Sequence, residues 1–164
     1  MSNLRDEDLD LRFKDPPRFT NKLPTFDISP IIERYSEFIR DLKLFLETEQ
    51  LPVTKSMLIS YASKCTDYET ALISLKSELS MAKSELSRDY RTSYRSLYGR
   101  STLGQKWETK IEVDMDPIIS DIQYNLDKVN VMVTCLEEFK WTLKTNRDIA
   151  KQYILHVNDF VPYS

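Results

Sequence analysis

The sequence predicts an all-α protein: a long antiparallel helical hairpin with a shorter helix before it. The seven prolines lie at 16, 17, 24, 30, 52, 117 and 162, which leaves 53–116 and 118–161 free of the residue that breaks helices. The chain has only two glycines in 164 residues, and 41% of its residues are hydrophobic, enough for a folded core. Length and composition therefore predict one helical domain over residues 29–164, preceded by a tail.

The tail is predicted to span residues 1–28, which carry five basic and six acidic side chains without a sustained apolar period. This composition favours a flexible, solvated segment, although its acidic first part and basic second part would also suit an interaction arm. Ser29 and Pro30 then form an N-cap followed by proline at the first helical position. Apolar residues recur at three- and four-residue steps up to Phe45, which predicts a helix over 29–50.

The second predicted helix, residues 54–98, carries an unbroken heptad seam, and Thr54 can cap its start. Nine residues follow one another at alternating steps of three and four: Leu58, Tyr61, Cys65, Tyr68, Leu72, Leu75, Leu79, Ala82 and Leu86. The next member, Asp89, is polar, and Tyr90 and Tyr94 continue a stripe displaced by one residue, which predicts a stutter. Both Cys65 and Tyr68 are expected in the core.

The third predicted helix, residues 117–160, starts after Asp116 as an N-cap, and the second is expected to end with Gly99 as a C-cap. At 1.5 Å per residue each long helix spans about 67 Å, and their equal lengths predict an antiparallel hairpin with its tip at 99–116. Asn146 lies in an apolar register and could fix helix partnering. A basic row predicts a solvated face: Lys140, Lys144, Arg147 and Lys151.

Within the tip, apolar and charged residues alternate from Lys106 to Met115. A period of two predicts one short β-strand. A single strand has no partner in a three-helix chain, so it would pair with another subunit and make the protein a homo-oligomer. The other interpretation is an extended connector that packs Trp107 and Ile111 onto the helices.

Composition also excludes most enzyme classes. Two glycines disfavour phosphate-binding loops, and one histidine removes most catalytic triads and histidine-based metal sites. The two cysteines fit neither a disulfide framework nor a zinc pattern, which indicates a reducing compartment. With no signal peptide and no apolar run near the length of a membrane span, we expect a cytoplasmic protein without catalytic activity, cofactor, metal or membrane association.

Four acidic residues near the tip could in principle hold Mg²⁺: Glu112, Asp114, Asp116 and Asp121. A cap formed by Asp116 and acids that complement the helix dipole account for them more simply. A metal-dependent nuclease is therefore the third-ranked interpretation.

The candidate binding site is the basic window 88–110, which has six basic and two acidic residues, a net charge of +4 in a chain of net charge −3. Arginines can hold phosphates while aromatic rings stack on unpaired bases, which is how proteins bind single strands with little sequence preference. The candidate DNA-binding residues are Arg88, Arg91, Arg95, Tyr98, Arg100, Lys106, Trp107 and Lys110. The alternative is an ordinary solvated helix end with Tyr90 and Tyr94 in the core.

Three stretches give the chain a resemblance to a known family. They are Tyr94–Arg100, the connector with Trp107-Glu108 and Lys110-Ile111, and the closing helix, above all Leu143–Ile149. Over roughly residues 55–160 the sequence resembles the UvsY-like recombination mediators of tailed phages, and only the first fifty residues depart from that pattern.

The resemblance implies a ring-forming helical protein in the cytoplasm of a bacterial host. Such a protein binds single-stranded DNA and loads a RecA-like recombinase onto strands covered by single-strand-binding protein. Family members use basic residues late in the helix before the Tyr-Gly turn, which match Arg88, Arg91 and Arg95. The competing class is a non-enzymatic structural or adaptor subunit, such as a coiled-coil virion assembly protein, for which the heptads alone suffice.

Overall fold

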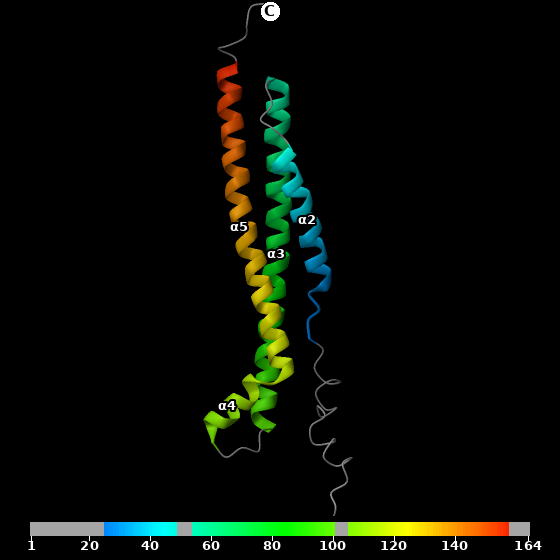
Figure 1. Ribbon diagram of the computed structural model, residues 1–164, viewed down its shortest axis with the longest axis vertical. Coiled ribbons are helices and arrows are strands. Elements are labelled where there is room, and N and C mark those ends of the chain that lie inside the picture. The colour runs from blue at the N-terminus through cyan, green and yellow to red at the C-terminus, as the bar shows by residue number, and fades with distance from the viewer. Residues whose placement is uncertain (1–24, 49–53, 101–104, 158–164) are drawn as a thin grey trace, which may run out of the picture. The chain divides into compact units, whose positions relative to one another are not determined.

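The computed structural model describes residues 25–48, 54–100 and 105–157. Of these residues 93% are helical, and none lies in a strand. The four helices, shown in Figure 1, are α2 (Ser29–Thr48), α3 (Lys55–Arg100), α4 (Lys106–Asp114) and α5 (Pro117–Val157). The predicted all-α class is confirmed. The expected flexible tail falls almost wholly on 1–24, which lie outside the described residues, as do the predicted helix ends at 49–50 and 158–160.

The chain divides into two compact units. The first, here called the three-helix unit, contains α2, residues 55–84 of α3 and residues 124–157 of α5. The second, the turn unit, contains residues 85–100 of α3, all of α4 and the first residues of α5. Among the described helices, none combines the length and the apolar character needed to cross a membrane.

In the three-helix unit, α3 and α5 form the arms of an antiparallel hairpin (Figure 1). Lys76 on α3 pairs with Glu137 on α5, whereas Glu69, one heptad earlier, pairs with Arg147, ten residues later. Residue numbers therefore rise along one helix as they fall along the other. The predicted hairpin is confirmed.

The shorter helix α2 also runs antiparallel to α3. The ring of Phe45, near the end of α2, stacks on Tyr61 with centroids 5.3 Å apart, while Arg34 on its second turn pairs with Glu78. Aromatic pairs of this kind add about 0.5–1.5 kcal/mol to the burial of their area. These two contacts fix the antiparallel direction of α2 along α3, and the buried apolar residues of α2 add to its packing.

The hydrophobic core follows the heptad seam. Eight of its nine predicted members on α3 are buried, and Tyr68 is half-buried. The α5 helix supplies residues at seven-residue steps, all fully buried: Val129, Leu136, Leu143 and Ala150. Seven-residue spacing on both helices is the pattern of coiled-coil packing, in which each side chain fills a hole in the opposite helix.

The predicted stutter near residue 90 is wrong. Ser93, seven residues after Leu86, is buried, whereas Tyr94 is only half-buried, so the original register continues. Two polar residues, Asp89 and Ser93, fit this register. The first has a hydrogen-bond partner, and the second has a small side chain. The Asp89 carboxylate accepts a hydrogen bond of 2.7 Å from the backbone N–H of Phe26, and a serine needs little space.

Two of the predicted helix caps are confirmed. Thr54 Oγ1 accepts from the backbone N–H of Met57 at 3.4 Å, and Asp116 Oδ1 accepts from that of Ile118 at 2.8 Å. At the start of α2 the capping side chain is Asp27 rather than Ser29, because the Asp27 carboxylate accepts from the Ser29 N–H at 2.9 Å. That hydrogen bond lowers the pKa of Asp27.

Gly99 does not end the helix as predicted. The α3 helix continues through Gly99 to Arg100, and no described glycine has the positive φ of a left-handed cap. Ile28, assigned to the tail, is buried, so ordered packing begins before the first helical residue.

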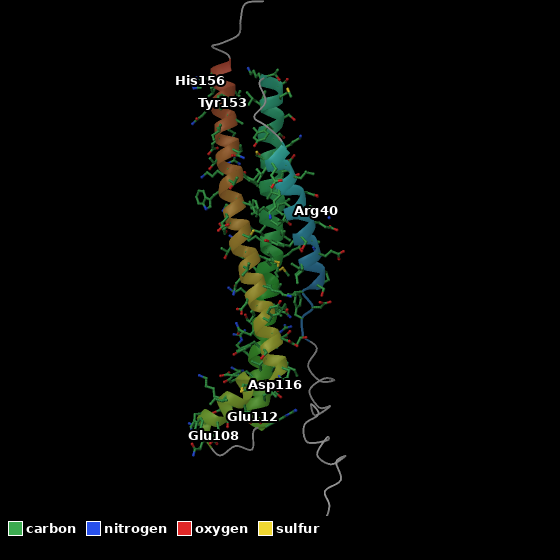
Figure 2. All side chains as sticks on the ribbon, viewed as in Figure 1. Arg40, Glu108, Glu112, Asp116, Tyr153 and His156 are labelled. Atoms are coloured by element: carbon green, nitrogen blue, oxygen red, sulfur yellow. The ribbon has the colours of Figure 1, made fainter. Side chains whose placement is uncertain are left out.

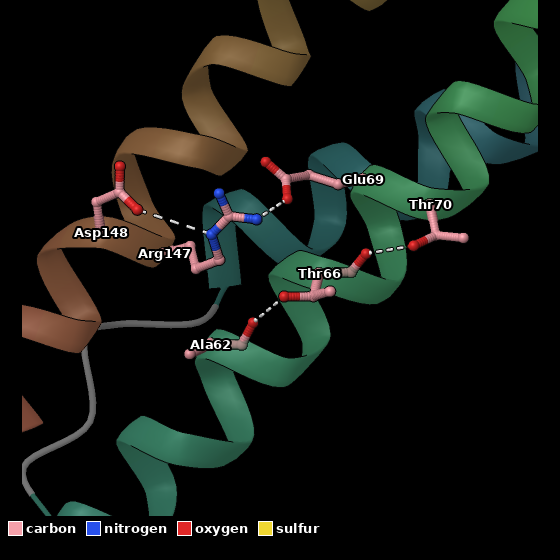
Figure 3. Close-up of polar contacts among 6 residues, drawn as sticks. All are labelled: Ala62, Thr66, Glu69, Thr70, Arg147 and Asp148. Atoms are coloured by element: carbon pink, nitrogen blue, oxygen red, sulfur yellow. Dashed lines mark hydrogen bonds and ion pairs between the residues drawn. The ribbon is translucent and has the colours of Figure 1, made fainter.

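A polar network crosses the α3–α5 interface of the three-helix unit, and Figure 3 shows its charged part. Arg147 pairs with Glu69, and both side chains are largely covered, at 21% and 13% exposure. The prediction that Arg147 belongs to a solvated row is therefore wrong. Its neighbour Asn146 donates from Nδ2 to Tyr61 Oη at 3.2 Å, an interhelical hydrogen bond of the kind that the predicted role in helix partnering needs.

Candidate nucleic-acid interface

The end of α3 presents three arginines to solvent. Arg88, Arg91 and Arg95 are all exposed. At about 100° per residue they fall within an arc of about 60° on the side of the helix opposite the buried Ser93. The helix register therefore gathers the three guanidinium groups on one face, as the spacing predicts. This set is called the arginine face below.

The arginines of this face differ in how they are engaged. Arg88 pairs with Glu85 one turn earlier on the same helix. Arg91 and Arg95 form no hydrogen bond or ion pair with other described residues of the chain. A guanidinium carries five N–H donors in a planar fork that matches a phosphate, so these two side chains offer the strongest free anion-binding capacity of the window.

A ladder of tyrosines flanks the arginine face. The ring centroids of Tyr90 and Tyr94 lie 5.8 Å apart, and those of Tyr94 and Tyr98 lie 6.3 Å apart with an interplanar angle of 16°. Tyr90 and Tyr94 are half-buried, whereas Tyr98 is exposed. Around the helix Tyr98 is only about 20° from Arg91. The ladder thus ends in an open aromatic ring beside the arginines.

The middle rung of the ladder connects α3 to α4. Partial burial raises the pKa of the Tyr94 hydroxyl, and the nearby negative charge and side-chain contact of Asp114 raise it further. Because the folded state favours the protonated phenol, this contribution to stability is present below the ordinary tyrosine pKa. It is lost as the pH rises through the raised value.

We expect Asp114→Asn to lower the pKa of Tyr94 toward its ordinary value, because the substitution removes a charge that opposes ionisation of the phenol. Nuclear magnetic resonance of the Tyr94 ring across alkaline pH measures this directly. Glu108→Gln, which removes a carboxylate on another side of α4, is the matched control. An unchanged Tyr94 pKa in the Asp114 variant would contradict the assigned contact.

Residues 106–114 form a helix, so both interpretations made for this segment, a strand and an extended connector, are wrong. When every second residue is apolar, the apolar residues can also be divided into two rows, each with a spacing of four residues. In a helix these two rows lie on different faces. Thr109 and Val113 form the buried row, whereas Trp107 and Ile111 lie on the outer side. Thr109 secures the first turn, because its N–H and hydroxyl both donate to the Gln105 carbonyl, at 3.1 and 3.2 Å.

The eight candidate DNA-binding residues therefore divide between two helices. Arg88, Arg91, Arg95, Tyr98 and Arg100 are all exposed on α3, and Arg100 has an interaction elsewhere in the chain. The other three, Lys106, Trp107 and Lys110, are exposed on α4. Trp107 Nε1 donates to the Gln105 side chain. No described contact joins the α4 residues to the arginine face.

The four acidic residues near the tip are spread along the turn unit, and Figure 2 labels two of them, Glu112 and Asp116. Asp114 lies near Tyr94, and Asp116 caps α5. Within the described ranges, no group of three or more potential ligands is placed to hold a metal ion. The capping explanation therefore accounts for Asp116.

Comparison with family models, with curated proteins and with solved structures returned no match. Sequence reasoning found the arginine face through its three- and four-residue spacing. It missed the outer apolar row of α4, although the four-residue step from Trp107 to Ile111 was available as a signal.

Proposed function

We propose that the protein is a non-enzymatic single-stranded-DNA-binding protein that contacts the phosphate backbone through the arginine face of α3. The observation that carries this proposal is the exposure of Arg91 and Arg95 on one face with no partner among the described residues. Such guanidinium groups attract phosphates and release counterions from the nucleic acid. The window's positive charge, within a chain of net charge −3, concentrates this attraction at one end of α3.

The tyrosine ladder favours single strands over duplex. The exposed ring of Tyr98 is beside the arginines and can stack on an unpaired base, whereas the bases of a duplex already stack on one another. Every base has a flat aromatic face, so this mode carries little sequence preference. We centre the DNA contact on α3, because Lys106, Trp107 and Lys110 belong to a separate helix.

Within this class, the proposed role is that of a recombination mediator in the cytoplasm of a phage-infected host. Its partners would be a RecA-like recombinase and single-strand-binding protein. The support is the resemblance of residues 55–160 to UvsY-like proteins together with the helical hairpin, which such a protein would use as a scaffold. A test adds the protein to strands covered by single-strand-binding protein and measures whether recombinase filaments form faster.

We expect Arg91→Ala combined with Arg95→Ala to weaken binding to a fluorescent single-stranded oligonucleotide and to flatten its salt dependence. The log–log slope on a single strand should fall by about 0.7 for each phosphate that the variant no longer neutralises. Fluorescence anisotropy titrations across a salt series measure both effects. Circular dichroism should stay unchanged, because both side chains face solvent.

The matched control for that double variant is Arg40→Ala combined with Lys43→Ala, which removes two exposed positive charges from α2. It should leave the slope nearly unchanged. Equal binding by wild type and the α3 variant at every salt concentration would contradict the proposal. The structural or adaptor subunit would then be preferred, because the buried heptads of α3 and α5 support that function without any DNA contact.

A further inference from the structure

The α4 helix of the turn unit exposes a row of large apolar side chains. Trp107 is 60% exposed, Ile111 50% and Met115, directly after the helix, 75%. They recur every four residues and so form one continuous strip, here called the α4 ridge. Single exposed apolar residues are ordinary, but a contiguous group rimmed by charges is typical of an interaction surface.

Charges of opposite sign flank the two sides of the α4 ridge. With about 100° per residue, Lys106 and Lys110 lie on one side, and Glu108 and Glu112 lie on the other. Asp114 also lies on the lysine side, but it approaches Tyr94 of α3. The exposed side of α4 therefore has an apolar centre, a basic flank and an acidic flank.

We propose that the α4 ridge binds the α4 ridge of a second copy of the chain, with the two helices parallel. A two-fold axis along parallel helices places the basic flank of each copy against the acidic flank of the other. A two-fold axis across antiparallel helices would place like flanks together. The flanks of α4 are therefore complementary to those of a second copy, and they select the parallel orientation. The inference does not depend on the proposed DNA contact.

The axial spacing also suits this pairing. In parallel helices in register, Lys110 lies two residues, about 3 Å of rise, from both Glu108 and Glu112 of the opposite copy. Trp107 and Ile111 would each meet their own counterpart across the axis. A nine-residue helix buries little area, so this contact belongs to the weak class of interfaces, below about 1,200 Å². Self-association should therefore depend strongly on concentration.

Charge reversal tests the pairing. Lys106→Glu with Lys110→Glu gives a chain with two acidic flanks, and Glu108→Lys with Glu112→Lys gives one with two basic flanks. Each variant alone should self-associate about tenfold more weakly than wild type. In each, flanks of like charge face each other on both sides of the paired α4 ridges. An equimolar mixture should recover the wild-type association constant. Sedimentation velocity over a concentration series provides these values.

The control is Lys43→Glu with Lys83→Glu, at exposed sites outside α4. It changes the net charge by the same amount as Lys106→Glu with Lys110→Glu and should leave association unchanged. Glu112 has an interaction within its own chain, so the single variants Lys110→Glu and Glu108→Lys provide a second pair if the double variant melts early. A wild type that stays monomeric throughout would overturn the proposal. Variants that associate like wild type, with no recovery on mixing, would overturn it as well.

Discussion

Replacing Leu72 with alanine should lower the free energy of unfolding by about 2–5 kcal/mol. Leu72 is fully buried at a heptad position of α3, in the middle of the three-helix unit. The substitution removes most of a buried side chain and leaves a cavity that long, regularly packed helices close only in part. Urea denaturation followed by circular dichroism measures the change.

The adjacent residue supplies a matched control for that experiment. Ile73 is exposed on the same helix, so Ile73→Ala removes a side chain of equal size without opening a cavity. Its effect should stay within about 0.5 kcal/mol. If the two alanine variants were destabilised equally, the heptad seam would not be the core of the unit.

The long helices could be predicted because their signal is repeated many times. Eight core positions on α3 obey one spacing rule, so a single polar member such as Asp89 does not hide it. The caps at Thr54 and Asp116 were predictable for a similar reason, because each depends on a side chain two or three residues from the group that it bonds.

The short helix α4 could not be predicted from the same kind of rule. Alternating apolar residues satisfy a strand with one buried face, but they also satisfy a helix with one buried and one exposed row. Only the packing of Thr109 and Val113 distinguishes these cases. The same ambiguity explains why the sequence alone places Trp107 and Ile111 on a strand or against the helices.

The environment of Arg147 depends on a partner that is distant in sequence. The three- and four-residue steps from Lys144 to Arg147 and Lys151 are those of a solvated basic row. Its ion pair with Glu69 joins residues 78 positions apart, which no local pattern reveals. The candidate arginines on α3 were predictable because their exposure follows from the local register alone.

Truncating Arg147 to alanine should lower the free energy of unfolding by about 3 kcal/mol, since removing one partner of a covered ion pair leaves the other charge poorly solvated. In the intact pair the Glu69 side chain is only 13% exposed, so its carboxylate depends on the guanidinium group to offset its charge. The control is Arg34→Ala, because the Arg34–Glu78 pair is exposed at 53% and 40%, and such pairs contribute about 0–1 kcal/mol. Equal destabilisation of the two variants would contradict the covered character of the Arg147 pair.

Replacing both partners of this ion pair shows whether the pair adds net stability, or whether the protein is destabilised only when one charge is left without the other. Among the described residues Arg147 Nε is buried without a hydrogen bond, and the Asp148 carboxylate lies 3.7 Å away, so desolvation of the guanidinium is incompletely offset. Replacing both partners, Glu69→Leu with Arg147→Met, should therefore restore stability to within about 1 kcal/mol of wild type or exceed it. A double variant as unstable as Arg147→Ala would show instead that the pair itself stabilises the α3–α5 interface.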